Sequence, residues 1–299
     1  MRASTLTLAT LAILMIMSPS IAENAITTEM VRIEGATYPI GSPEGRESAQ
    51  PEHSVTLRPF LIDAYEVTNQ EFAAFLNTLD IQARRDVPAG ELSPDDVEGR
   101  DADRVWGGAS GDERTYIEMD DTDARIGIRN GKFVPEPGFS DHPAPESTWA
   151  GARVYCAWRG ARLPSEAEWE AAARGKEGRT YPWGEAPPTP ERAVYGRARG
   201  NTDPVGRHPD GATPEGVFDL AGNEAEWTSS LFRPYPYDAE DGREDLEASG
   251  ERVTRGGDHV FDVSHDHLTG YFRDGFSRDP QRGHRHIGFR CAKDVSAEQ

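Results

Sequence analysis

Glycine and proline recur along the whole chain and limit the architectures that it can adopt. The 299 residues include 30 glycines and 22 prolines, and these are scattered rather than gathered in one segment. Glycine lacks the Cβ that restricts the backbone, and proline lacks the N–H that helices and sheets use, so both interrupt regular structure. The pattern predicts short elements joined by long ordered loops, and it excludes a helical bundle or a regular parallel sheet.

Two short helices can nevertheless be located, and a third segment is a weaker candidate. The first follows Thr68 and Glu71, a capping box in which the threonine oxygen accepts the third amide and the glutamate reaches back. Apolar residues then recur at helical spacing. A second box at Ser165 and Glu168 predicts another helix, and residues 148–158 form a weaker candidate.

The remaining elements are expected to be short strands and turns. The predicted strands are residues 30–33, 54–57, 60–62, 252–255 and 287–291. Residues 80–140 are acidic and glycine-rich, with few apolar side chains before position 116, so we expect a surface insertion rather than a separate domain. Residues 292–299 are expected to form a polar tail.

The first 22 residues have the parts of a secretory signal peptide. Arg2 precedes an apolar run at 6–17, and small residues lead to Ala22. The run is shorter than the roughly 20 residues that a membrane-spanning helix needs. The alternative is a buried N-terminal helix. Cleavage after Ala22 would leave residues 23–299 as a secreted or periplasmic protein, with no membrane insertion after cleavage.

The charge balance excludes two classes of partner. The chain has 52 acidic and 32 basic residues, a net charge of −20. This balance argues against nucleic acids and anionic membranes. It identifies no ligand, and solubility alone would explain it.

The chain has two cysteines, Cys156 and Cys291. An even number in an exported protein is compatible with one disulfide. The alternative is two unrelated free thiols, which an oxidising compartment makes a liability.

Ten short motifs follow one another along the chain. They are MVRIEG at 30–35, PEH at 51–53, DAYEVTN at 63–69, HP at 142–143, YCAW at 155–158, RLPSEAEWE at 162–170, YPWG at 181–184, DLAGNEAEW at 219–227, RGG at 255–257 and IGFRC at 287–291. In this order the chain resembles the formylglycine-generating-enzyme (sulfatase-modifying factor) domain family. The resemblance implies a single α+β domain over residues 23–299, with a C-type-lectin-like fold, sparse secondary structure and long ordered loops.

The resemblance also implies a disulfide and a calcium site. It implies that Cys156 and Cys291 are bonded, whereas the positions of a second family disulfide hold Ala173 and Phe272. Calcium-binding members use the segment that matches residues 219–226. Carried over by position, the calcium ligands are Asp219, Gly222, Glu224 and Glu226. The alternative is an acidic turn without an ion.

The catalytic cysteine pair of the family is missing. The enzymes of this family oxidise a sulfatase cysteine with Cu(I) held by two thiolates, because a soft metal needs soft ligands. Counted forward from Gly257, the two positions are Phe261 and Asp266; counted back from Cys291, the second is His267. Copper-thiolate chemistry is therefore not expected, and whether the chain is an enzyme stays open.

A cluster of other metal-ligating residues stands in the same segment. It contains His259, Asp262, His265, Asp266 and His267. In an extended chain the three histidines would share a face, and imidazoles with carboxylates suit iron or zinc. The alternative is a polar surface loop.

Three functions follow from this sequence. The first is an exported binding or accessory module for a peptide, glycan or protein ligand. The second is a metal-dependent oxidoreductase that uses the cluster of histidine and aspartate. The third, and least favoured, is a genuine formylglycine-generating oxidase.

Overall fold

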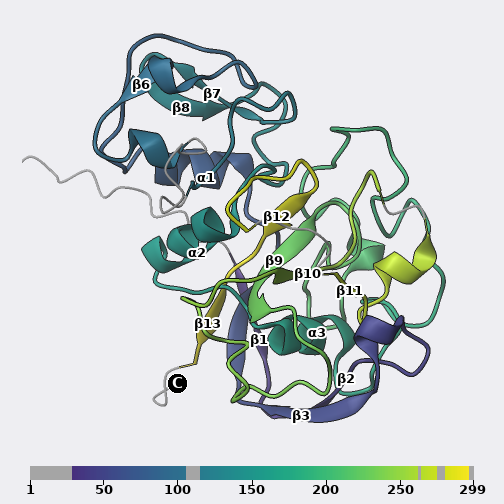
Figure 1. The fold of residues 1–299 in the computed structure, drawn as a ribbon. Coiled ribbons are helices and arrows are strands. Elements are labelled where there is room, and N and C mark those ends of the chain that lie inside the picture. Colours follow the sequence, from purple (N-terminus) through teal and green to yellow (C-terminus); the bar gives the residue numbers. More distant parts are fainter. Residues whose placement is uncertain (1–28, 106–114, 262–263, 275–279, 296–299) are drawn as a thin grey trace, which may run out of the picture.

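The computed structural model describes residues 29–105, 115–261, 264–274 and 280–295. Its helices are α1 (Asn69–Leu76), α2 (Trp149–Trp158) and α3 (Glu166–Arg174), all short (Figure 1). The strands are β1 (Met30–Ile33), β2 (Ala36–Ile40), β3 (His53–Leu57), β4 (Phe60–Asp63), β5 (Gln82–Ala83), β6 (Val97–Glu98), β7 (Ile126–Arg129), β8 (Lys132–Pro135), β9 (Ala225–Leu231), β10 (Arg252–Arg255), β11 (Arg273–Asp274), β12 (Ile287–Phe289) and β13 (Ala292–Asp294). In these ranges no helix has the length and apolar character needed to cross a membrane.

Local capping chemistry places the helices as predicted. Thr68 accepts the amide of Glu71 while the Glu71 side chain accepts the amide of Thr68, and Ser165 and Glu168 do the same before α3. The α3 helix ends at Gly175, whose φ of 63° suits a residue without a side chain. The weaker candidate, α2, also forms, and Thr148 caps it.

A four-stranded sheet in the order β11-β10-β9-β12 forms the centre of the molecule. Every residue of β9 is buried, β10 pairs with it antiparallel, and β12 pairs with it in parallel. Ala225 lies opposite Ile287, and Glu226 lies opposite both Arg255 and Gly288. This sheet therefore joins three of the motifs that are far apart in the sequence.

Both ends of the described chain meet in a second sheet, β1-β4-β13. Ala292 pairs with Ile62 and is fully buried. The expectation that 292–299 is a polar tail is therefore wrong for residues 292–294, because their backbone groups complete this sheet. Ile62 and Ala292 belong to a hydrophobic cluster that also contains Trp169 of α3.

The acidic segment 80–140 packs on α1 and α2. Figure 1 shows β6, β7 and β8 gathered beside α1, and β8 is in contact with that helix. Side chains from this segment, including Val97, Ile128 and Phe133, share one hydrophobic cluster with Phe72 and Tyr155. The segment buries more apolar side chains than its composition indicated, and it does so against the rest of the molecule.

The predicted disulfide forms between Cys156 of α2 and Cys291, which lies between β12 and β13. The two Cα atoms are 5.6 Å apart, and both residues are fully buried. The bond closes a separation of 135 positions, so by the chain-entropy argument it stabilises the fold by about 5 kcal/mol.

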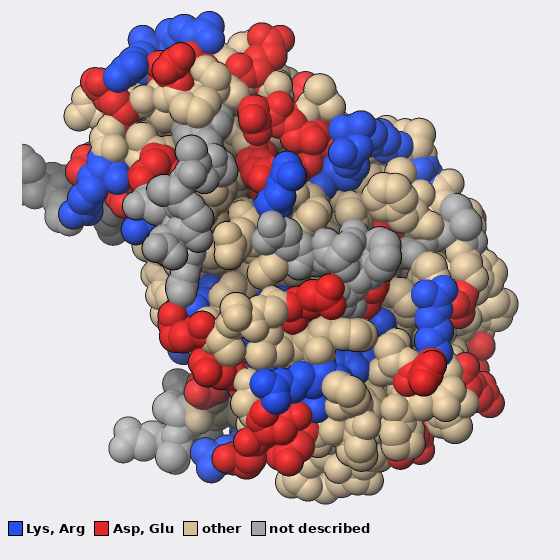
Figure 2. All heavy atoms as spheres, in the orientation of Figure 1, with Lys and Arg blue, Asp and Glu red and all other residues tan. Residues whose placement is uncertain are grey.

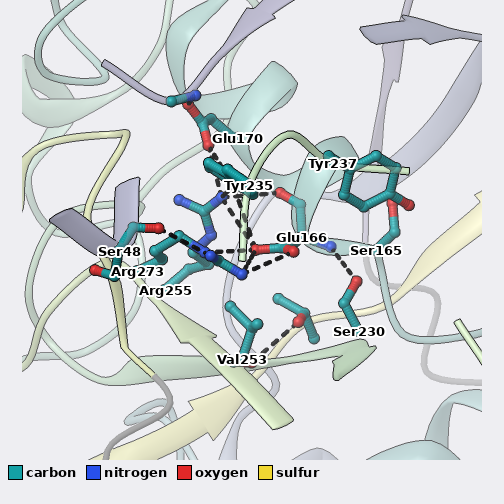
Figure 3. Close-up of polar contacts among 12 residues, drawn as sticks. Ser48, Ser165, Glu166, Glu170, Ser230, Tyr235, Tyr237, Val253, Arg255 and Arg273 are labelled. Carbon is teal, nitrogen blue, oxygen red and sulfur yellow. Dashed lines mark hydrogen bonds and ion pairs between the residues drawn. The ribbon is translucent and has the colours of Figure 1, made fainter. Parts of the chain in front are cut away.

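A buried ionic network fixes α3 against the central sheet (Figure 3). Glu166 pairs with Arg273 of β11 at 2.8 Å, and Glu170 pairs with Arg255 of β10 at 2.6 Å. Arg243 pairs with Glu166 as well, at 3.1 Å. All of these side chains are 0–1% exposed.

We predict that Glu170→Gln strongly destabilises the protein. The change removes the carboxylate charge that both Arg174 and Arg255 contact in the interior, and Arg255 keeps a more distant acid in Glu166, at 3.8 Å. Loss of one partner of a buried pair costs about 3–5 kcal/mol, measured as the free energy of unfolding in urea. Glu177→Gln is the control, since Glu177 is 71% exposed and its partner Arg179 keeps Glu215 at 3.0 Å; the pair of an exposed acid contributes about 1 kcal/mol or less. Equal effects of the two changes would contradict the prediction.

Candidate functional site

The segment that follows β10 lines two adjoining cavities. The first, here the Phe261 cleft, has a volume of about 350 Å³. Its lining consists of Ala225, Thr254, Arg255, Gly257, Asp258, Phe261, His267, Phe272, Asp274, His286 and Ile287. The second, here the Glu146 cavity, has a volume of about 650 Å³ and is lined by Glu118, Asp121, Glu146, Phe261, Arg282, Gly283, His284, Arg285 and His286. Phe261 and His286 line both.

Phe261, one of the former cysteine positions, exposes an aromatic ring. Gly256 and Gly257 have φ values of 95° and 70°, so the chain turns sharply as it leaves β10. Asp258 then accepts the Phe261 amide at 2.6 Å and holds the turn. The Phe261 side chain is 58% exposed and its ring meets His286 edge-on at 4.7 Å. The ring therefore stands where the two cavities adjoin, within reach of an occupant of either one.

The structure does not bring the three histidines together. Residues His265–Leu268 form a 3₁₀ helix, so an extended face does not exist there. The exposed His265 meets the ring of Tyr195, whereas His267 stacks on Phe272 and contacts the guanidinium of Arg46.

Of the remaining members, Asp266 lies 3.8 Å from His267, whereas His259 stands apart. His259 is fully buried, and its Nδ1 lies 2.9 Å from the carbonyl oxygen of Asn223. Asp266 lies on the surface and pairs there with Arg46 at 3.2 Å. Asp262 lies outside the described residues.

The predicted calcium segment is held by protein contacts. Both carboxylate oxygens of Glu226 accept from Arg290, at 2.6 and 2.7 Å, and one also accepts from Trp169. Asp219 accepts the Gly206 amide at 2.6 Å, and Gly222 forms the turn with a φ of 82°. Both oxygens of Glu226 are therefore already bonded within the protein, and Arg290 is its ion-pair partner.

Glu66 is a buried acid of this region that the sequence analysis missed. Its oxygens accept the amide of Glu224 at 2.9 Å and the side chain of Asn223 at 2.6 Å. Burial, together with the charges of Asp219 and Glu226, raises the pKa of Glu66 well above its ordinary value. It stands in the DAYEVTN motif, where only a strand end and a helix cap were apparent.

Glu224 is buried without a hydrogen-bond donor for either carboxylate oxygen among the described residues. The buried ring of His259 lies 3.7 Å from one of these oxygens. Burial raises the pKa of Glu224 well above its ordinary value, and the charge of Glu66 adds to this. The side chain therefore belongs to the interior and does not project into an open binding loop.

Asp121, Asp123 and Glu146 form a group that the sequence did not indicate. Each offers a carboxylate oxygen, and the three oxygens lie within 4.8 Å of one another. Across the described ranges this is the one such group of three among histidine, cysteine, aspartate and glutamate side chains. Burial raises the pKa of Glu146 to about 8, with a contribution from the charge of Asp121.

We predict that His259→Gln changes the pH dependence of stability. Burial lowers the pKa of His259 below its ordinary value, so the unfolded chain binds the proton more readily. The wild-type protein therefore loses stability through this residue as the pH falls below about 6.5. Glutamine retains an N–H donor for Asn223 and cannot be protonated.

The measurement is the free energy of unfolding of both proteins at pH 7.5 and pH 5.0. The advantage of the wild type over His259→Gln is expected to be smaller at pH 5.0. The exposed His265 provides the control, as His265→Gln should leave the difference between the two pH values unchanged. A variant that loses as much stability as the wild type on acidification would contradict the prediction.

Comparisons with known proteins identify relatives over most of the chain. The family described as "Sulfatase-modifying factor enzyme 1-like domain" matches residues 18–295. The chain is 33% identical to a formylglycine-generating enzyme from Streptomyces coelicolor, over 90% of each chain. It is 31% identical to a bovine protein named inactive C-alpha-formylglycine-generating enzyme 2, over 90% of this chain and 89% of that one.

Two further matches are similar to this chain in a more restricted way. The chain is 32% identical to the serine/threonine-protein kinase Pkn1 of Chlamydia trachomatis over 90% of its own length, but it spans only 39% of that protein. The solved structure of PvdO from Pseudomonas aeruginosa has a TM-score of 0.60 at 23% identity, over 89% of this chain and 94% of that one. The latter similarity concerns the fold alone.

Proposed function

The chain belongs to the sulfatase-modifying factor enzyme 1-like domain family, and we propose that within it the protein is a binding or accessory module without copper-thiolate oxidase activity. One observation carries the proposal. Both cysteines of the chain are joined in the buried disulfide of α2, so neither is a free thiolate in the Phe261 cleft. Without thiolates, Cu(I) lacks the soft ligands that it requires.

Family membership alone does not decide the activity. The relatives include a protein named as a formylglycine-generating enzyme and others named as inactive ones, at similar levels of identity. The residues at the former catalytic positions therefore carry more weight. Here they are an aromatic ring at Phe261 and a surface helix that carries Asp266 and His267.

The ligand that the Phe261 cleft suits best is a basic side chain of a peptide or protein. Phe261, His267 and Phe272 line the cleft, and the exposed ring of Phe261 can attract a cation. Asp258 and Asp274 add negative charge. The lining arginine, Arg255, is neutralised by Glu170, so it does not repel a cation. A glycan that stacks on Phe261 is the alternative ligand.

The proposal is tested with two labelled peptides. One carries a central arginine between glycine and alanine residues, and the other carries citrulline, which has the same shape without the charge. Fluorescence anisotropy should show tighter binding of the arginine peptide, and Phe261→Ala should weaken it about tenfold or more. Trp158→Ala removes another exposed aromatic ring, on α2, and serves as the matched control.

The same protein, supplied with copper, should leave the cysteine of a sulfatase-derived peptide unchanged by mass spectrometry. Formation of formylglycine would overturn the absence of oxidase activity. Equal binding of the arginine peptide and the citrulline peptide would overturn the assignment of the ligand. So would a Phe261→Ala variant that binds the arginine peptide as the wild type does.

The second function, a metal-dependent oxidoreductase that uses the cluster of histidine and aspartate, is not favoured, because the rings of His259, His265 and His267 face different neighbours. The proposal also requires no calcium ion in the 219–226 segment.

We further propose that the protein is exported. The support is the apolar run at 6–17 between Arg2 and Ala22, which lies outside the described residues. Expressed in a bacterial host with its full sequence, the protein should be recovered outside the cytoplasm with Glu23 as its first residue. Recovery in the cytoplasm with Met1 retained would contradict export.

A further inference from the structure

We propose that Asp121, Asp123 and Glu146 bind a hard divalent cation, such as Ca²⁺ or Mn²⁺, at the wall of the Glu146 cavity. The donors are carboxylate oxygens only. Oxygen donors select hard cations over copper or zinc. The proposal concerns a site separate from the Asp219–Glu226 segment, and it does not depend on the ligand of the Phe261 cleft.

The spacing of the three carboxylates suits such an ion. Their nearest oxygens lie within 4.8 Å of one another. A cation with oxygen ligands at about 2.3–2.6 Å spans about 4.6–5.2 Å between ligands on opposite sides. The three oxygens can therefore contact one ion without a large movement of the backbone.

Glu146 provides the second, independent observation. The residue is 2% exposed, and its Oε1 atom is buried with no hydrogen-bond partner among the described residues. A buried carboxylate oxygen without a donor costs free energy in the folded state. The side chain points toward Asp121 and Asp123, because its ligand oxygen lies within the shared 4.8 Å. A cation bound through Oε1 would supply the missing contact.

The backbone holds Glu146 in this position. Its amide donates to the carbonyl of His284 at 3.0 Å, and its carbonyl accepts the amide of Glu118 at 3.0 Å. At Gly283, a Cβ would lie 2.2 Å from the Glu146 carbonyl oxygen, so the two segments are in close contact. The third ligand is therefore fixed between two walls of the cavity rather than carried on a free loop.

The two aspartates are positioned by arginines. Arg199 contacts Asp121 at 3.1 Å and also bonds Asp123, and Arg285 lies 3.4 Å from Asp123. The contacts with Asp123 involve its Oδ2 atom. Arg199 and Arg285 thus hold the two aspartates beside Glu146, and a cation bound there would be balanced by the Glu146 carboxylate in its ionised form.

The test is binding of Mn²⁺ and of Ca²⁺ to the purified full chain after treatment with EDTA. Isothermal titration calorimetry gives the affinity, and the electron paramagnetic resonance signal of free Mn²⁺ gives the stoichiometry. We expect one ion per chain. The isosteric changes Glu146→Gln and Asp123→Asn should each weaken binding about tenfold or more.

Two control variants locate the ion. Glu118→Gln changes a neighbouring acid of the cavity, and Asp219→Asn changes the segment that the family resemblance assigns to calcium. Both should bind as the wild type does. Near-ultraviolet circular dichroism of the metal-free variants checks that their folds are intact. The proposal is overturned if the wild type binds neither ion at millimolar concentration, if folded Glu146→Gln binds equally, or if Asp219→Asn alone abolishes binding.

Discussion

The ionic network between α3 and the central sheet determines the position of the cleft. Glu166 and Glu170 are fully buried and are surrounded by arginines of three other segments. Burial alone would raise the pKa of Glu170, but Arg255 and Arg174 lower it, so the carboxylate stays ionised in the interior. A charge of this kind cannot shift without losing its partners. Since Arg255 precedes Gly256, Gly257 and Asp258, the network also fixes the turn that carries Phe261. A fold with little regular structure thus gains a rigid centre, while acidic and basic side chains lie in separate patches among other residues on its visible face (Figure 2).

Local chemistry explains which parts of the fold the sequence predicted. The boxes at Thr68 and Ser165 are complete within four residues, so their helices could be identified without knowledge of the tertiary structure. The pairing of Cys156 with Cys291 needed the family resemblance, since the spacing of two cysteines does not determine whether they meet. Strand β9 was missed because its polar residues, Thr228 to Ser230, do not alternate with apolar ones. They are buried because neighbouring main-chain and side-chain groups satisfy them, as Val253 does for Thr228.

The candidate site was predictable only where it lies in one segment. Phe261 could be recognised from its position after the two glycines. The group at Asp121, Asp123 and Glu146 could not, because the approach of Glu146 to the aspartates depends on how residues 80–140 pack. For the histidines, the sequence predicted a group that the structure does not form. They are close in sequence, but the 3₁₀ helix at 265–268 and the buried carbonyl of Asn223 direct their rings to different places.

The two cavities have a common wall, and this has a thermodynamic consequence. Phe261 and His286 line both the cleft and the Glu146 cavity, with their rings in contact at 4.7 Å. An occupant of either cavity that shifts one of these rings alters the shape of the other cavity. The free energy of that coupling is reciprocal, so each occupant would change the affinity for the other by the same factor. Two neighbouring surfaces of this protein would then respond as a single unit.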